Sequence, residues 1–131
     1  MEEKITLDGD LVSSLALAYL GDAVLEIHIR EYVLRSGKAK VDDLHRASVR
    51  YVCAKAQSRV YDEIGGFLTR DEAEVMNRGR NTKKKIPKNV EMKDYRKSTG
   101  FEALLGWLYL EGSQERVLEL VEKAITIVER G

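Results

Sequence analysis

The chain has 131 residues, of which 44% are hydrophobic and 34% charged, with 22 basic and 22 acidic side chains. This composition is typical of one soluble globular domain, and it excludes a disordered chain or a membrane-spanning one. A single cysteine, Cys53, excludes an internal disulfide, and the acidic N-terminus does not resemble a secretory signal, so we expect a cytoplasmic protein.

The first predicted helix is the most apolar part of the chain. Either Asp10 or Ser13 could cap it, and its periodicity continues to about Arg35. Six apolar residues, 15–20, open the helix, and a glycine and then Asp22 follow directly. Because so apolar a helix is usually buried on most sides, the carboxylate of Asp22 is expected to need a cation or a hydrogen-bond donor.

Two further helices are predicted between residues 41 and 79. One covers residues 41–64, where apolar and small side chains recur every three or four positions and two glycines end the pattern. The next begins at Thr69, because Thr69 and Glu72 have the spacing of a capping box, and it fades near Gly79.

Residues 81–90 show no periodicity and contain the only proline and three consecutive lysines, so we predict an exposed loop with a function. The window 78–97 around it holds nine basic and two acidic side chains, although the whole chain is neutral. Such a basic patch is the electrostatic footprint of a polyanion such as nucleic acid. The residues expected to contact it are Arg78, Arg80, Lys83, Lys84, Lys85 and Lys88.

Two helices are predicted in the last third, one from about Met92 to Leu110 and one from Ser113 to Glu129. No alternating pattern typical of strands persists, and no internal repeat or domain boundary is visible. The sequence therefore predicts one all-α domain over residues 1–131, with five to seven helices.

A second acid, Glu102, lies in an otherwise apolar stretch of the helix that starts near Met92, and Gly106 follows one turn later. If this helix crosses the first one at the two acids, Asp22 and Glu102 could share a Mg²⁺ ion, which accepts one or two carboxylates together with water and phosphate. With a basic loop nearby, such a site indicates metal-dependent cleavage of nucleic acid. The alternative is that the acids form structural ion pairs with Arg30, Arg96 or His45.

Two motifs carry a resemblance to a known family. Residues 19–25, YLGDAVL, resemble the ribonuclease III signature F-L-G-D-[AS]-V-L, and residues 101–106, FEALLG, with Tyr109 and Leu110, resemble the second motif of that family. The similarity extends over roughly residues 10–130 and is greater to Mini-ribonuclease III, the short bacterial subfamily. The stretches that support the subfamily are 15–26, 54–57, 78–81, 87–89 and 95–99.

The resemblance implies the all-α ribonuclease III endonuclease domain without a double-stranded RNA-binding domain, assembled as a homodimer whose valley holds duplex RNA. It implies an endoribonuclease in which Asp22 and Glu102 are the catalytic acids that bind Mg²⁺, leaving 5′-phosphate and 3′-hydroxyl ends. It also implies a role in maturation of the 23S ribosomal RNA precursor, with a ribosomal protein that presents the substrate as a further partner.

The chain departs from the larger enzymes at three positions where those enzymes carry acids, which here are Leu15, Ala18 and Thr99. Asp22 and Glu102 are the central acids that remain, so the number of metal ions stays open; Asp94 could contribute through water. Two other classes of function also stay open at this point. One is a non-catalytic dimer that binds double-stranded RNA, and the other is a helical interaction domain in which both acids are structural.

Overall fold

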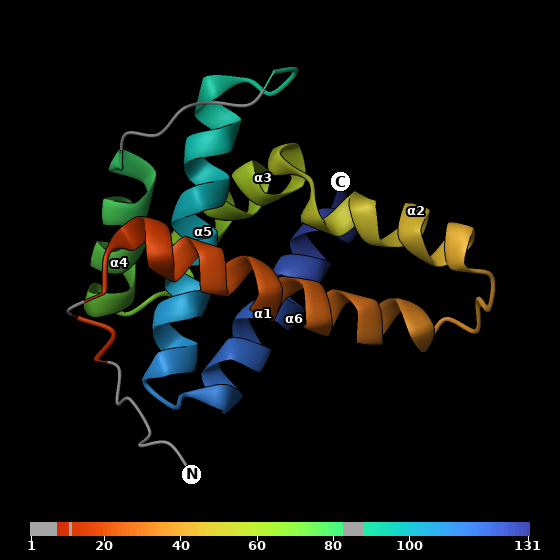
Figure 1. Ribbon diagram of the computed structural model, residues 1–131, viewed down its shortest axis with the longest axis horizontal. Helices are drawn as coiled ribbons and strands as arrows, with labels where there is room; N and C mark the ends of the chain where they lie inside the picture. The colour runs from red at the N-terminus through yellow and green to blue at the C-terminus, as the bar shows by residue number, and fades with distance from the viewer. Residues whose placement is uncertain (1–7, 11, 83–87) are drawn as a thin grey trace, which may run out of the picture.

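The computed structural model describes residues 8–10, 12–82 and 88–131, and these form six α-helices, one short 3₁₀ helix and no strand (Figure 1). This confirms the predicted all-α fold. None of the described helices is both long and apolar enough to cross a membrane. The elements are α1 (Ser14–Leu34), α2 (Val41–Val52), α3 (Ala54–Ile64), η1 (Gly65–Phe67), α4 (Arg70–Asn81), α5 (Met92–Leu110) and α6 (Gln114–Arg130).

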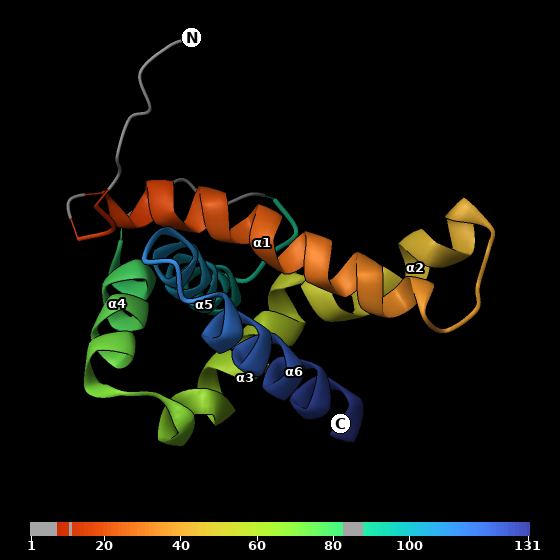
Figure 2. The ribbon, with the colours of Figure 1, turned by 90° about the horizontal axis from the view of Figure 1, so that it is seen from below.

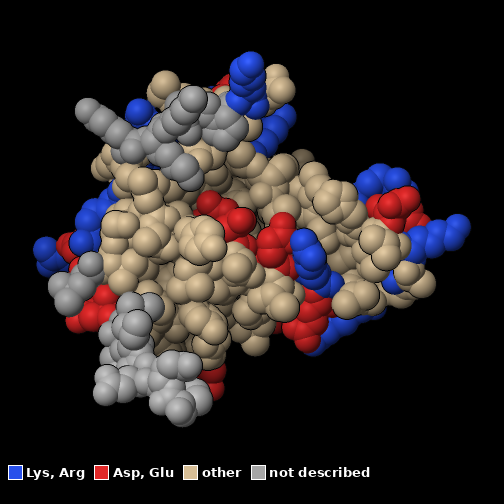
Figure 3. Space-filling view, in the orientation of Figure 1, with Lys and Arg blue, Asp and Glu red and all other residues tan. Residues whose placement is uncertain are grey.

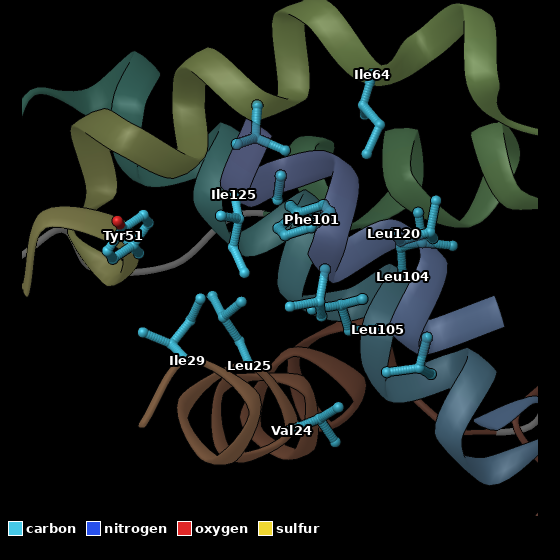
Figure 4. Packing of buried hydrophobic residues seen from close by; sticks show 14 of the residues in the cluster. Val24, Leu25, Ile29, Tyr51, Ile64, Phe101, Leu104, Leu105, Leu120 and Ile125 are labelled. Carbon is cyan, nitrogen blue, oxygen red and sulfur yellow. The ribbon is translucent and has the colours of Figure 1, made fainter. Parts of the chain in front are cut away.

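The helix α5 is the centre of the fold. In Figure 2, where α5 is seen nearly end-on, α1 lies on one side of it, α3 and α6 lie on the other, and α4 stands beside it. Its side chains Phe101, Leu104 and Leu105 are fully buried and contact apolar residues of the surrounding helices (Figure 4). Because apolar burial is the main favourable term in folding, these contacts fix where the other helices can sit around α5.

The helices α1 and α5 cross in backbone contact. A Cβ atom added at Gly21 would lie 1.6 Å from the carbonyl oxygen of Glu102, and one added at Gly106 would lie 2.0 Å from the carbonyl oxygen of Leu17. Only glycine allows two helix backbones to come this close, because any side chain would occupy the space of the other backbone. Gly21 of α1 and Gly106 of α5 therefore form the closest part of this helix contact.

The prediction of one helix over residues 41–64 is wrong, because the helix breaks at Cys53. The backbone of Cys53 is extended, with ψ at 155°, and α3 starts at the next residue. The buried side chain of Gln57 donates from Nε2 to the carbonyl oxygen of Val52 at 2.7 Å, which satisfies one carbonyl at the end of α2. The break lets α2 run along α1 while α3 turns to pack on α5, and no glycine or proline marks it.

The start of α4 is fixed by local and tertiary contacts together. Thr69 and Glu72 form the predicted capping box, in which the hydroxyl of Thr69 accepts from the backbone N–H of Glu72 at 3.2 Å. The buried carboxylate of Glu72 also accepts two hydrogen bonds from Arg116 of α6, at 2.8 and 2.9 Å. These hydrogen bonds lower the pKa of Glu72 below its usual value of 4.5. The ion pair thereby ties α4, the helix that leads into the basic loop, to α6.

We expect Gly21→Ala to lower the free energy of unfolding by about 3 kcal/mol or more, because its Cβ would overlap the backbone of α5. Urea denaturation followed by circular dichroism measures the change. Gly66→Ala is the matched control, because a Cβ at Gly66 meets nothing within 4 Å. Equal stabilities of the two variants would contradict the proposed role of the glycine contact.

We expect Arg116→Met to lower the free energy of unfolding by about 3 kcal/mol at pH 7, because it leaves the carboxylate of Glu72 buried without its cation. The pKa of Glu72 is lowered in the folded protein, so the stabilisation is present above pH 4.5 and is lost as the pH falls through the folded-state pKa. The difference in the free energy of unfolding between the parent and Arg116→Met should therefore become smaller below pH 4.5. Arg70→Met, which removes an exposed pair with Glu74, should change stability by less than about 0.5 kcal/mol.

Candidate active site

Asp22 lies beside the contact between α1 and α5. It follows Gly21 in the chain, and its side chain is exposed and forms no hydrogen bond or ion pair with any residue that the structure describes. The expectation of a buried acid is wrong, because α1 packs on the fold with one face only. Asp22 falls at the edge of that face, so its charge stays in water and needs no partner for stability.

Glu102 lies on α5 at the same crossing. Its side chain is half-buried, and its backbone carbonyl is the group that a side chain at Gly21 would overlap. The two helix segments that carry the acids predicted from the sequence are therefore in direct backbone contact. Asp22 belongs to α1 and Glu102 to α5, so one acid comes from each of the two helices that cross.

The donor set at the junction fits a divalent cation that prefers oxygen. Asp22 and Glu102 offer carboxylate oxygens, and the exposure of Asp22 leaves room for water and for a phosphate group. Mg²⁺ commonly binds to one or two carboxylates and keeps several waters, so a pair of acids is sufficient for it. The residues present thus match the chemistry of a magnesium site.

The alternative in which Asp22 forms a structural ion pair is not observed in the part of the chain that the structure describes. Arg30, one of the cations considered as a partner, instead forms an ion pair with Glu26 at 2.9 Å, one helical turn before it. His45 lies on α2 and lines a groove between α1 and α2 that does not include Asp22. No described cation therefore neutralises Asp22.

Three other residues near the second motif have different surroundings. The hydroxyls of Ser98 and Thr99 are buried and both donate to the carbonyl oxygen of Tyr95, at 2.7 and 2.9 Å, so their protons are used inside α5. Asp94 lies eight residues before Glu102, about 12 Å along the helix axis, and lines a pocket of about 550 Å³ with Lys55. Asp94 is thus too far along α5 to share an ion with Glu102 directly.

A further acidic group was not predicted from the sequence. The carboxylates of Asp8, Asp10 and Glu111 are all exposed and lie within 4.8 Å of one another. The carboxylate of Asp10 also accepts a hydrogen bond from the indole N–H of Trp107 at 3.0 Å. Glu111 lies far from Asp8 and Asp10 in the sequence, so only the tertiary structure brings it to them.

The basic residues predicted to bind nucleic acid lie at the end of α4 and before α5. Arg78, Arg80 and Lys88 are exposed, whereas residues 83–85 lie outside the described part of the chain. Figure 3 shows the face over which α1 runs: its surface is largely uncharged, with acidic side chains near the centre and basic ones mainly toward the edges. A polyanion on this face would meet cations around the acids.

The outer side of α1 carries a set of exposed apolar side chains that the sequence predicted to be buried. Tyr19 is 85% exposed, Ile27 is 66% exposed and Leu34 is 58% exposed. Tyr19 and Ile27 are eight residues apart and therefore lie on one side of the helix, with Ala23 between them. We call these four residues the outer face of α1, and Asp22 lies at its edge.

Comparison with known proteins identifies the family. Residues 15–113, which include both motifs and both acids, match the family described as Ribonuclease III domain. The chain belongs to the ribonuclease III family. It is therefore an endoribonuclease, and the ribonuclease III domain implies that a divalent metal ion is used and that double-stranded RNA is the substrate.

Within the ribonuclease III family, the chain is similar to short members. It is 43% identical over 129 residues to "Mini-ribonuclease 3" of Brevibacillus brevis, an alignment that covers 98% of this chain and 96% of that protein. It is 47% identical over 118 residues to "Mini-ribonuclease 3" of Symbiobacterium thermophilum, covering 89% and 91%. The crystal structure of a protein from Fusobacterium nucleatum superimposes with a TM-score of 0.82 at 31% identity, covering 91% of this chain and 96% of that one.

Proposed function

We propose that this chain is a Mg²⁺-dependent endoribonuclease of double-stranded RNA, and that Asp22 and Glu102 are its catalytic, metal-binding acids. The observation that carries the proposal is the glycine contact between α1 and α5, because it brings the segments of both acids to one junction. The exposure of Asp22 supports the same reading, because an acid that stabilises the fold would be paired, whereas a ligand for substrate and metal must be accessible.

The chemistry follows from the two carboxylates. When bound, Mg²⁺ supplies activation of water and offsets charge that develops on the phosphate. Asp22 reaches the substrate from the exposed side, and the half-buried Glu102 is held in place by the helix packing around it. The products of this hydrolysis would carry 5′-phosphate and 3′-hydroxyl ends.

The substrate is proposed to bind across the face that holds the acids. Arg78, Lys88 and the lysines at 83–85 would contact its phosphates, so affinity should fall steeply with salt. Recognition of the A-form duplex would then depend mainly on shape and on 2′-hydroxyl groups. We propose the 23S ribosomal RNA precursor in the cytoplasm as the natural substrate, with a ribosomal protein that presents it.

We also propose that the active form is a homodimer joined through the outer face of α1. Tyr19, Ile27 and Leu34 expose more than half of their surface, and contiguous exposed apolar side chains commonly mark a protein interface. A second copy of α1 offers the same apolar surface and could cover this one around a two-fold axis. Because Asp22 borders this face, the two sets of acids would lie on either side of the interface.

We expect purified protein to cleave a long RNA duplex with Mg²⁺ and not with a chelator. Asp22→Asn and Glu102→Gln should each abolish cleavage while duplex binding is retained, because each removes one charged ligand of the ion. Denaturing gel electrophoresis measures cleavage, and gel shift in chelator measures binding. Glu26→Gln, which alters an acid one turn away that is paired with Arg30, is the control and should stay active.

Binding without any cleavage by the parent protein would favour the non-catalytic RNA-binding dimer instead. Loss of folding rather than loss of cleavage in Asp22→Asn would favour a structural role for that acid. Thermal unfolding of Asp22→Asn in chelator separates these outcomes, and its melting temperature should match that of the parent, because the side chain is exposed and unpaired among the described residues.

We expect Tyr19→Asp to raise the dissociation constant of the homodimer at least about tenfold, because a charge would be buried in an apolar contact. Analytical ultracentrifugation over a range of concentrations measures this change. Leu118→Asp on α6 is the matched control, since Leu118 is also exposed, at 47%, but lies outside the outer face of α1. If the two variants dissociate equally, or if the parent is monomeric, the proposed interface is wrong.

A further inference from the structure

The two arginines near the end of α4 flank a glycine that packs against α5. A Cβ atom added at Gly79 would lie 2.9 Å from the Cα atom of Gly100 and 2.8 Å from the Cβ atom of Ala103. Residues of an α-helix are about 100° apart around the axis, so Arg78 and Arg80 project to opposite sides of this contact. Although they are only two residues apart and carry the same charge, Arg78 and Arg80 therefore face different parts of the molecule.

Arg78 lies on the side of α4 that faces α1. Val75, one turn before Arg78, is buried and packs with Leu17 and Ala18 of α1 and with Ala103 of α5. Figure 2 shows α4 beside α5, with α1 on one side of it. The side of α4 that carries Arg78 is therefore the side that faces α1, the helix to which Asp22 belongs.

Arg80 lies on the side of α4 that faces α3. Its guanidinium carbon is 6.0 Å from the centre of the Tyr61 ring, within the range of a cation–π contact. The hydroxyl of Tyr61 in turn donates to the side-chain oxygen of Asn77 at 2.6 Å, one turn before Arg80. Arg80 thus takes part in the packing of α3 against α4.

Arg78 has no comparable contact. Its side chain is exposed, and it forms no ion pair with any residue in the described part of the chain. A guanidinium can bind two oxygens of one phosphate at once and keeps its charge at any physiological pH. An exposed, unpaired arginine on the side of α4 that faces α1 therefore matches the phosphate backbone of the substrate.

We infer that Arg78 binds a phosphate of the RNA duplex next to the two acids, whereas Arg80 holds α4 against α3 and makes no phosphate contact. This inference rests on the proposed function and deepens it, because it gives different roles to two arginines that cannot be distinguished by charge. The contact between Gly79 and Gly100 sets the rotation of α4 about its axis and thereby the directions of the Arg78 and Arg80 side chains.

The matched pair Arg78→Gln and Arg80→Gln tests the inference, with each change made in the Asp22→Asn protein so that the RNA stays intact. Duplex affinity is measured over a series of salt concentrations. Arg78→Gln should reduce the slope of log Kd against log salt by about 1, because one phosphate contact is lost. Arg80→Gln should leave the slope unchanged and lower the melting temperature by about 2–4 °C, because a packing contact is lost.

Arg78→Lys provides the control for charge and should retain the salt slope, since a lysine can still neutralise a phosphate. Equal slopes for Arg78→Gln and Arg80→Gln, or a reduced slope for Arg80→Gln alone, would overturn the division of roles. Parent protein that neither binds nor cleaves duplex RNA would overturn the proposed function itself. Parent protein that cleaves while Arg78→Gln binds with the parent's salt slope would overturn only this inference.

Discussion

The backbone contact of α1 with α5 is the constraint on which the rest of the structure depends. Gly21 lies against the carbonyl group of Glu102, and Gly106 lies against that of Leu17, so neither helix can rotate or slide without overlap. Interiors are close-packed and do not deform continuously, so one such contact fixes a register. Here the register places the residue after Gly21 and the residue four before Gly106 at one junction, and both of these residues are acids.

A second glycine contact gives α5 control over the basic side of the molecule. Gly79 of α4 packs on Gly100 of α5, two residues before Glu102, while the ion pair of Glu72 with Arg116 holds the other end of α4. The same central helix therefore positions the acids through α1 and the arginines through α4. This arrangement keeps the distance between the acids and the arginines constant.

The surface of α1 has three parts with different surroundings. One side packs on α5, a second side exposes the large apolar residues Tyr19 and Ile27, and Asp22 lies between the two sides. A helix that is apolar nearly all round would be fully buried in a larger protein. In this small domain the other described helices do not cover it completely, so Tyr19 and Ile27 stay exposed and Asp22 lies at the border of that exposed surface.

The sequence by itself determined the features that depend on neighbouring residues. These are the helical class, the capping box of Thr69 with Glu72 and, as predictions from two motifs, the acids Asp22 and Glu102. For the first helix, Asp10 and Ser13 were both candidate caps, and the structure has Ser13. Only the tertiary structure decided the break at Cys53, the exposure of Asp22 and which helices Arg78 and Arg80 face. The physical reason is that caps and periodicity depend on neighbouring residues, whereas the burial and rotation of a helix depend on which distant backbone it contacts. Here those contacts are made at glycines, and a glycine in the sequence does not indicate which helix it will contact.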